Sequence, residues 1–285
     1  MGKTRFLLDS FHLSPLLTLI IILFFVPESN GQCFDNNTAF KEGEVLKYEV
    51  YYNLGLIWLN AGYVDFKVKP GVYRGRNIYH LDAYGSSYKS YDWIFKVRDR
   101  YQCYLDRENL KPLWFHRENY EGGFEVDYKY IFDWENRRVF SETWNSDRPY
   151  SQDTLPITPC TFDVQSLIYY SRNLDFNRMK VGDSIPVKAF IDNESYDLYI
   201  RYLGKEHMET REGKKYRCIK FSALLVQGTI FRGGENLFVW VTNDKNRIPV
   251  LVDAKILIGS VKAYLVSAEG LLNESNALVE SGTNP

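Results

Sequence analysis

The sequence predicts a mainly β protein, a curved antiparallel sheet or incomplete β-barrel with one helix packed on it. Apolar and polar residues alternate along residues 46–52, 64–69 and 124–130. That period of two is typical of antiparallel strands with one buried and one solvent-facing side. Turn signals such as Pro70-Gly71 and Gly122-Gly123 separate these segments at short intervals. About a dozen strands fit this pattern, and so many twisted strands must curl, close or stack to bury one face.

An outer-membrane β-barrel is the alternative architecture, because its strands alternate in the same way. The chain, however, ends in a polar segment, residues 273–285, rather than in an aromatic-terminated strand. We therefore expect the alternating strands to pack as a curved sheet outside the membrane.

The first element in chain order is a predicted signal peptide, residues 1–31. Lys3 and Arg5 precede an apolar run over residues 13–26. A signal-peptide core has roughly 7–15 apolar residues, whereas about 20 are needed to span a bilayer. Small residues before Gln32 predict cleavage after residue 31, so we expect an exported protein with no transmembrane helix in the mature chain. The alternative is a lipoprotein signal that lipidates Cys33, although Gln32 stands where such signals have a small residue.

The mature chain, residues 32–272, is predicted to form a single β-rich domain. Its two strand-rich halves, about 40–145 and 181–269, are joined by a loop and a helix. Residues 146–159 are rich in Pro, Ser and Asp, which predicts the loop. Residues 273–285 are predicted to be a polar tail that frays.

The helix is predicted over residues 161–176, where the period changes from two to three-and-four spacing. Apolar residues recur at this spacing from Val164 to Leu174. Thr161 is the predicted N-cap, and Asp163 complements the helix dipole in the first turn. One helix is thus available to cover the sheet.

Composition and motifs exclude several classes of function. The net charge is −1 and charged residues are evenly spread, which argues against a nucleic-acid partner. The 4 histidines form no metal motif, and no nucleophile elbow, phosphate loop or dinucleotide loop is present. We therefore predict a non-enzymatic protein with no catalytic residues, metal or cofactor. An envelope hydrolase that uses two carboxylates is the alternative, since Asp and Glu are frequent on the polar strand faces.

The 4 cysteines are Cys33, Cys103, Cys160 and Cys218. An oxidising compartment permits disulfides, and four cysteines allow three pairings. Buried free thiols are the alternative, above all for Cys218, which lies in a strand pattern. The wide spacing of the cysteines argues against a zinc site.

Three phrases in order resemble a family of exported Gram-negative envelope proteins known as a domain of unknown function. They are the F-x-x-G-E-x-L-x-Y-x-V-x-Y phrase from Phe40 to Tyr52, the helix opening from Cys160 to Ser166, and the segment from Trp240 to Leu265. The resemblance implies a periplasmic or cell-surface location in a Gram-negative bacterium and a large antiparallel β fold. It implies no activity. A fainter similarity to periplasmic lipoprotein-carrier half-barrels concerns the fold alone.

Two short triplets resemble the acceptor for protein O-glycosylation in some anaerobic Gram-negative bacteria. They are Asp153-Thr154-Leu155 and Asp183-Ser184-Ile185. Thr154 and Ser184 are therefore candidate modification sites.

The function predicted from this architecture is the binding of a hydrophobic or amphipathic envelope component, such as a lipid, lipoprotein or glycolipid. The concave face of a curved sheet is filled by side chains, covered by a helix or occupied by a ligand, and one helix covers only part of it. Because a one-residue register error reverses each strand, the inward-facing residues are not fixed by sequence. The alternative partner is another envelope protein, for which this chain is a scaffold. The candidate lining residues are Tyr48, Tyr52, Trp58, Trp93, Phe124, Tyr128, Phe238 and Trp240.

Overall fold

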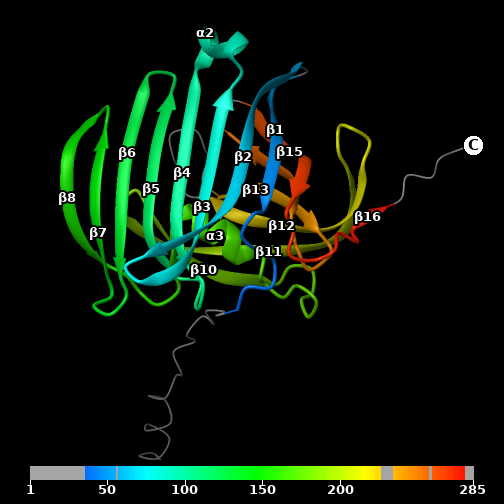
Figure 1. Ribbon diagram of the computed structural model, residues 1–285. Helices are drawn as coiled ribbons and strands as arrows, with labels where there is room; N and C mark the ends of the chain where they lie inside the picture. Colours follow the sequence, from blue (N-terminus) through cyan, green and yellow to red (C-terminus); the bar gives the residue numbers. More distant parts are fainter. Residues whose placement is uncertain (1–35, 56, 226–233, 257–258, 280–285) are drawn as a thin grey trace, which may run out of the picture. The chain divides into compact units, whose positions relative to one another are not determined.

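The computed structural model describes residues 36–55, 57–225, 234–256 and 259–279 (Figure 1). The described strands all belong to one 16-stranded sheet, which is curved and does not close. This confirms the predicted fold class. The predicted signal peptide and Cys33 lie outside the described residues. No helix in the described ranges is long and apolar enough to cross a membrane.

The N-terminal half of the sheet is a meander of eight strands in which each pairs with the next. They are β1 (Val45–Leu54), β2 (Ile57–Tyr73), β3 (Arg76–Ser87), β4 (Val97–Asp106), β5 (Pro112–Glu121), β6 (Phe124–Asp133), β7 (Arg138–Asn145) and β8 (Arg148–Pro156). Between β3 and β4 the chain forms the short helices η1 (Lys89–Tyr91) and α2 (Asp92–Phe95).

The C-terminal half is a second meander that joins the first where β1 pairs with β15. Its strands are β9 (Thr161–Phe162), β10 (Ser184–Ile191), β11 (Glu194–Glu209), β12 (Lys215–Leu225), β13 (Gly234–Thr242), β14 (Pro249–Lys255), β15 (Ser260–Glu269) and β16 (Leu278–Val279). Strands β9 and β10 pair in parallel, whereas β16 pairs antiparallel with β12. The two outer edges of the sheet are therefore β8 and β9.

Helix α3 (Val164–Ser171) lies in the curve of the sheet and contributes to the packing of both halves (Figure 1). Tyr169 packs in the core of the N-terminal half with Phe40 and Phe115. The next residue, Tyr170, packs in the core of the C-terminal half with Phe176. One short helix thus fills the middle of the concave face, because large side chains on two sides of the helix pack into the two cores.

The predicted helix was too long and its N-cap was wrong. Asp163 is the N-cap, and its carboxylate accepts hydrogen bonds from the Gln165 and Ser166 amides at 2.8 and 2.9 Å. Thr161 instead pairs with β10 as part of β9. The helix ends at Ser171, because the chain after it turns to place Leu174 in the core of the C-terminal half.

Two other sequence-based expectations also differ from the structure. The predicted loop at 146–159 contains β8, an edge strand that pairs with β7. The first residues of the predicted polar tail are docked rather than frayed, because Asn273 exchanges hydrogen bonds with Asn246 and Ala277 is fully buried. Residues 280–285 of that tail lie outside the described residues.

The described cysteines are of two kinds. Cys160 is disulfide-bonded. Cys103 and Cys218 are free thiols, and both are buried. The two alternatives that the sequence leaves open therefore each apply to some of the cysteines.

Candidate ligand site on the polar part of the concave face

The concave face of the N-terminal half changes from apolar to polar along its strands. On β5, the inward-facing residue Phe115 is followed by Arg117, Asn119 and Glu121. Because alternate residues of a strand share a face, all four side chains point to the same side. Phe115 packs in the same core as Tyr169 of α3, so the polar residues extend beyond it towards the β5–β6 turn.

The neighbouring strand β4 shows the same change, because Tyr101 and Asp99 lie on its inward face beyond the buried Cys103, and pairing places Asp99 opposite Asn119. On β6, Tyr128 lies opposite Arg117, whereas Val126 and Phe124 beyond it remain apolar and pack on the core. Six inward-facing residues of these three strands form a contiguous group, called the polar cluster below: Asp99, Tyr101, Arg117, Asn119, Glu121 and Tyr128.

Arg117 is the central cation of the polar cluster. Its guanidinium carbon lies 5.8 Å from the Tyr101 ring centroid and 5.9 Å from that of Tyr128. Its Nη1 donates to Asp192 Oδ1 at 3.0 Å, whereas Nε has no hydrogen-bond partner among the described residues. The guanidinium is thus held between two aromatic rings with donor capacity left over.

Asp99 and Glu121 form a carboxyl pair beside Arg117. Burial raises the pKa of Asp99 to about 7, and the neighbouring Glu121 carboxylate adds to this shift. The Asp99 Oδ1 atom has no hydrogen-bond partner in the described ranges. Near neutral pH the Asp99 carboxyl is therefore present in both its protonated form, which donates a hydrogen bond, and its ionised form, which only accepts.

Asn119 is the most deeply buried polar group of the cluster, with 5% of its surface exposed. Its Nδ2 donates to Tyr101 Oη at 2.8 Å and to Glu121 Oε1 at 3.2 Å. Its Oδ1 has no partner in the part of the chain that the structure describes. A buried acceptor without a hydrogen bond costs free energy, and a ligand donor can satisfy it.

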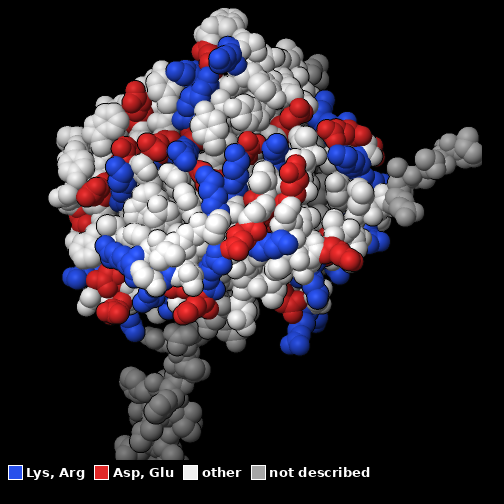
Figure 2. Space-filling view, viewed as in Figure 1, with Lys and Arg blue, Asp and Glu red and all other residues white. Residues whose placement is uncertain are grey.

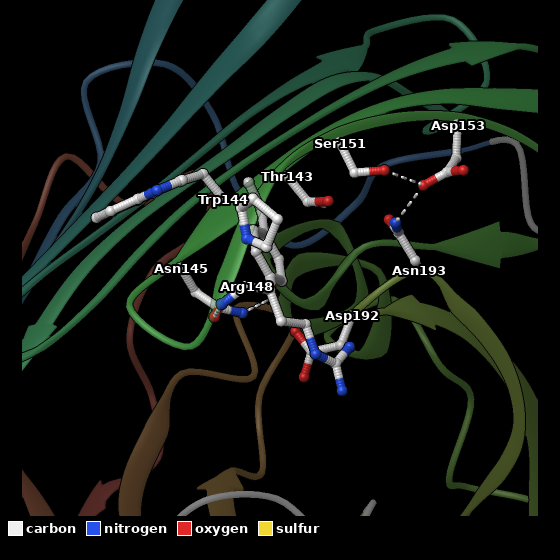
Figure 3. Close-up of a pocket in the computed structure, with 10 residues that line it drawn as sticks. Thr143, Trp144, Asn145, Arg148, Ser151, Asp153, Asp192 and Asn193 are labelled. Atoms are coloured by element: carbon white, nitrogen blue, oxygen red, sulfur yellow. Dashed lines mark hydrogen bonds between the residues drawn. The ribbon is translucent and has the colours of Figure 1, made fainter.

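A pocket of about 180 Å³ lies between β7–β8 and the β10–β11 turn, and it adjoins the polar cluster at Tyr128 (Figure 3). Tyr128 belongs to both the polar cluster and the pocket lining, and its hydroxyl accepts a hydrogen bond from Asn145 Nδ2 at 2.6 Å. Across the pocket, Asn193 Nδ2 donates to Asp153 Oδ2 at 3.4 Å. The remaining lining residues are Thr143, Trp144, Arg148, Pro149, Ser151 and Asp192.

The β10–β11 turn has the backbone geometry that Asp and Asn tolerate best. Asp192 and Asn193 are the two central residues of this hairpin, and both have positive φ, at 50° and 66°. Two-residue hairpins need this left-handed conformation, in which Asn and Asp are enriched. The turn thereby brings Asp192 to Arg117 and Asn193 to the edge of β8.

The model of a family described as "Protein of unknown function (DUF3108)" matches residues 47–266. The chain belongs to the DUF3108 family. A crystal structure of a beta-barrel-like protein of domain of unknown function DUF1849 from Brucella abortus is similar in fold, with a TM-score of 0.52 and 8% identity over 81% of this chain and 99% of that chain. No curated protein matches the sequence.

The structure of this DUF3108 chain places the eight predicted lining aromatics in several separate locations. Tyr128 lines the pocket, and Phe124 packs on the core of the same half. Tyr48 is buried elsewhere, and its hydroxyl donates to the Pro249 carbonyl at 3.0 Å. Tyr52 and Trp58 belong to the β1–β2 hairpin, Trp93 lies on α2, and Phe238 and Trp240 belong to a cluster with Cys218.

The Phe238–Trp240 cluster lies on the opposite face of the C-terminal half from α3. Val239 and Val241, on either side of Trp240, pack with Tyr170 of the helix, so Trp240 points the other way. The Trp240 indole donates to Glu206 of a nearby strand. These aromatics therefore share no surface with the polar cluster.

The sequence reasoning missed Asp99, Arg117, Asn119 and Glu121. A signal for them exists, because alternate positions from Leu113 to Glu121 change from apolar to polar within one strand. No group of three or more His, Cys, Asp or Glu residues that could hold a metal occurs in the described ranges. The candidate glycosylation residues Thr154 and Ser184 are both exposed, on β8 and β10.

Proposed function

We propose that this protein is an exported, non-enzymatic binding protein of the bacterial envelope, and that its ligand is an amphipathic molecule with a sugar-like head, such as a glycolipid. The head binds at the polar cluster and the adjoining pocket. The observation that carries the proposal is the set of buried or half-buried groups with unused hydrogen-bonding atoms around Arg117. Among the described residues, Asp99 Oδ1 and Asn119 Oδ1 are unpaired acceptors there and Arg117 Nε is an unpaired donor; these three atoms are buried, so a head group reaches them when a neighbouring side chain moves.

The mixture of groups fits a polyhydroxylated head better than a simple anion. A hydroxyl group both donates and accepts, so it can pair with Asn119 Oδ1 and with Arg117 Nε. The carboxyl groups of Asp99 and Glu121 oppose the binding of an anion at the same place. The pocket volume of about 180 Å³ is below the roughly 300–1,000 Å³ of drug-sized sites, which suits a single head group.

An acyl chain has no place in the apolar part of the concave face. That part is filled by Phe40, Phe115 and Tyr169 in one core and by Phe176 in the other. Well-packed cores do not open for an extra chain without a large cost. The protein therefore recognises the polar head, and the apolar part of the ligand lies outside the sheet.

The carboxylate-dependent hydrolase is the second candidate, since Asp99 has a raised pKa beside Glu121. Glycosidases, however, hold their two carboxyl groups roughly 5–9.5 Å apart, with the scissile bond between them. Here the Glu121 carboxylate is close enough to raise the pKa of Asp99, and Glu121 Oε1 accepts from Asn119 Nδ2 at 3.2 Å. Two carboxyl groups on adjacent strands, one of them held by a buried amide, favour a role in binding.

Calorimetric titration with a water-soluble short-chain alkyl glycoside, and with its free sugar, tests the proposal. Arg117→Met should weaken binding roughly ten- to hundredfold, because it removes charge-assisted hydrogen bonds. Arg100→Met is the matched control, since Arg100 is on the same sheet but bonds to Asp82 on the outer face. No binding by the parent protein, or equal binding by Arg117→Met, would contradict the proposal. Turnover of the glycoside would favour the hydrolase.

A further inference from the structure

One end of the sheet carries a group of exposed large apolar side chains. Trp93, Ile94 and Phe95 of α2 are 83%, 59% and 50% exposed, and Ile57 and Trp58 of the β1–β2 hairpin are 57% and 39% exposed. Helix α2 and this hairpin lie at the same end of the strands (Figure 1). These five residues are called the apolar rim below. Trp93, Ile94 and Phe95 are consecutive on α2, and clusters of exposed apolar residues mark interaction sites more often than single exposed residues do.

Helix α2 is anchored to the strands around it, so the exposure of Trp93 follows from the fold. Asp92 accepts from Arg98 Nη2 at 2.6 Å and from Ser87 Oγ at 2.7 Å. The Tyr88 amide donates to the Ala61 carbonyl at 2.9 Å and ties the segment to β2. Hydrogen bonds thus hold the start of α2 in place and leave Trp93 and Ile94 in solvent.

The apolar rim is also basic, although the whole chain has a net charge of −1. Residues 89–98 carry Lys89, Lys96 and Arg98 against the single acidic residue Asp92, which pairs with Arg98. Lys262 lies with its Nζ 4.9 Å from the Trp58 ring centroid and pairs with Asp253 at 3.3 Å, so the unpaired positive charge among the described residues here is that of Lys89 and Lys96. Figure 2 shows Lys and Arg side chains beside α2, next to an uncharged area of the surface.

We propose that the apolar rim docks on the surface of an anionic lipid bilayer. Trp93, Ile94 and Phe95 enter the boundary between head groups and acyl chains, and Lys89 and Lys96 contact anionic head groups. Trp is enriched at this boundary, and Lys side chains extend from apolar surfaces to reach it. Combined apolar and basic contacts bind peripheral proteins to anionic membranes.

Size favours a bilayer over a protein as the occupant. A stable protein interface buries about 800 Å² on each partner. The apolar rim has five side chains on a four-residue helix and a hairpin end, which is a small and protruding surface. A bilayer needs no matching flat surface, because lipids rearrange around inserted side chains.

Docking would place the polar cluster close to the lipid head groups. Phe95 lies against Gly122, because a Cβ added there would be 2.3 Å from its ring. Gly122 directly follows Glu121 of the polar cluster. Docking itself does not depend on the proposed glycolipid binding, since the apolar rim contacts ordinary phospholipids.

Co-sedimentation of the mature chain, starting at Gln32, with vesicles tests this proposal. The vesicles contain phosphatidylethanolamine and phosphatidylglycerol, and phosphatidylcholine vesicles provide the neutral comparison. Replacing both Trp93 and Ile94 by Ser should weaken partitioning roughly tenfold or more, because two large apolar side chains are lost from the contact. Lys89→Ser with Lys96→Ser should weaken binding to the anionic vesicles only.

Val72→Ser is the matched control, because Val72 is 70% exposed at the other end of β2. Its binding should equal that of the parent, and circular dichroism should show the same fold for all variants. The proposal is wrong if the parent protein does not bind the anionic vesicles, or if Trp93→Ser/Ile94→Ser binds as the parent does. It is also wrong if sedimentation equilibrium shows that this double variant only dissociates a dimer. Glycoside titration of the same double variant separates the two proposals, since its head-group binding should be unchanged.

Discussion

Arg172 and Glu44 form a fully buried ion pair with two parallel hydrogen bonds, at 2.6 and 2.8 Å. Arg172 follows α3, and Glu44 directly precedes β1. The same guanidinium donates to the carbonyls of Ala39 and Asn246, at 3.2 and 3.0 Å. The pair therefore joins the helix to the N-terminal segment and to the turn before β14, where the two halves of the sheet meet.

We predict that Arg172→Met lowers the free energy of unfolding by about 3–5 kcal/mol, because it leaves the Glu44 carboxylate buried without its partner. Urea unfolding followed by tryptophan fluorescence measures the change. The double variant Glu44→Leu/Arg172→Met should lose less than the sum of the single variants, since no unpaired charge remains. Lys188→Ala, which breaks an exposed pair with Asp197, is the control and should change stability by less than about 1 kcal/mol. A similar loss of stability in Arg172→Met and Lys188→Ala would contradict the prediction.

We predict that neither Cys103 nor Cys218 reacts with a thiol reagent while the protein is folded. Burial raises the pKa of Cys103 well above its usual value and that of Cys218 to about 12, so little reactive thiolate forms. Labelling of the two thiols, monitored by absorbance, should begin only when the protein unfolds. Peptide mapping without reduction should find Cys160 in a cross-linked peptide whose partner is neither of these two residues. Rapid labelling of the folded protein would refute the burial of the thiols.

A glycine pair tests how α2 is held against the β5–β6 turn. Gly122 and Gly123 both have positive φ, at 60° and 101°, so Ala costs about 1–2 kcal/mol of backbone strain at Gly122 and at least as much at Gly123, whose φ lies beyond the left-handed helical region. A Cβ at Gly122 meets the Phe95 ring at 2.3 Å, whereas a Cβ at Gly123 has nothing within 4 Å. We predict faster tryptic cleavage after Lys96 in Gly122→Ala than in Gly123→Ala. Equal cleavage rates would show that Phe95 does not anchor α2.

The sequence predicted the sheet because most strands bury one face, which leaves an alternating pattern. It did not predict β8, because an edge strand whose side chains are almost all exposed buries no apolar stripe. The N-cap was misplaced by two residues since Thr161 and Asp163 are both good caps. Only the buried position of Asp163, with its two amide hydrogen bonds, distinguishes them.

The candidate site was less predictable than the fold, because it depends on strand register. The guanidinium of Arg117 is surrounded by Tyr101 and Tyr128 on the neighbouring strands and by Asp192, which is 75 positions away in sequence. The aromatics predicted to line the site belong to both faces of the sheet. Because residue type alone does not say which face a strand residue occupies, the prediction included core residues such as Tyr48 alongside Tyr128.

Asp99 makes the stability of the folded protein depend on pH. Its folded pKa of about 7 lies above the unfolded value of about 3.9, so the folded state binds the proton more tightly. The stabilisation from this proton is complete below about pH 4 and is lost as the pH rises through 7. Asp99→Asn should therefore remove a downward slope of stability between about pH 4 and pH 7, which urea unfolding at several pH values measures. Asp197→Asn, at a side chain that is 83% exposed, should keep the parent's slope. If Asp99→Asn and the parent have parallel pH profiles, Asp99 ionises at its ordinary pKa, and the polar cluster does not hold a proton near neutral pH.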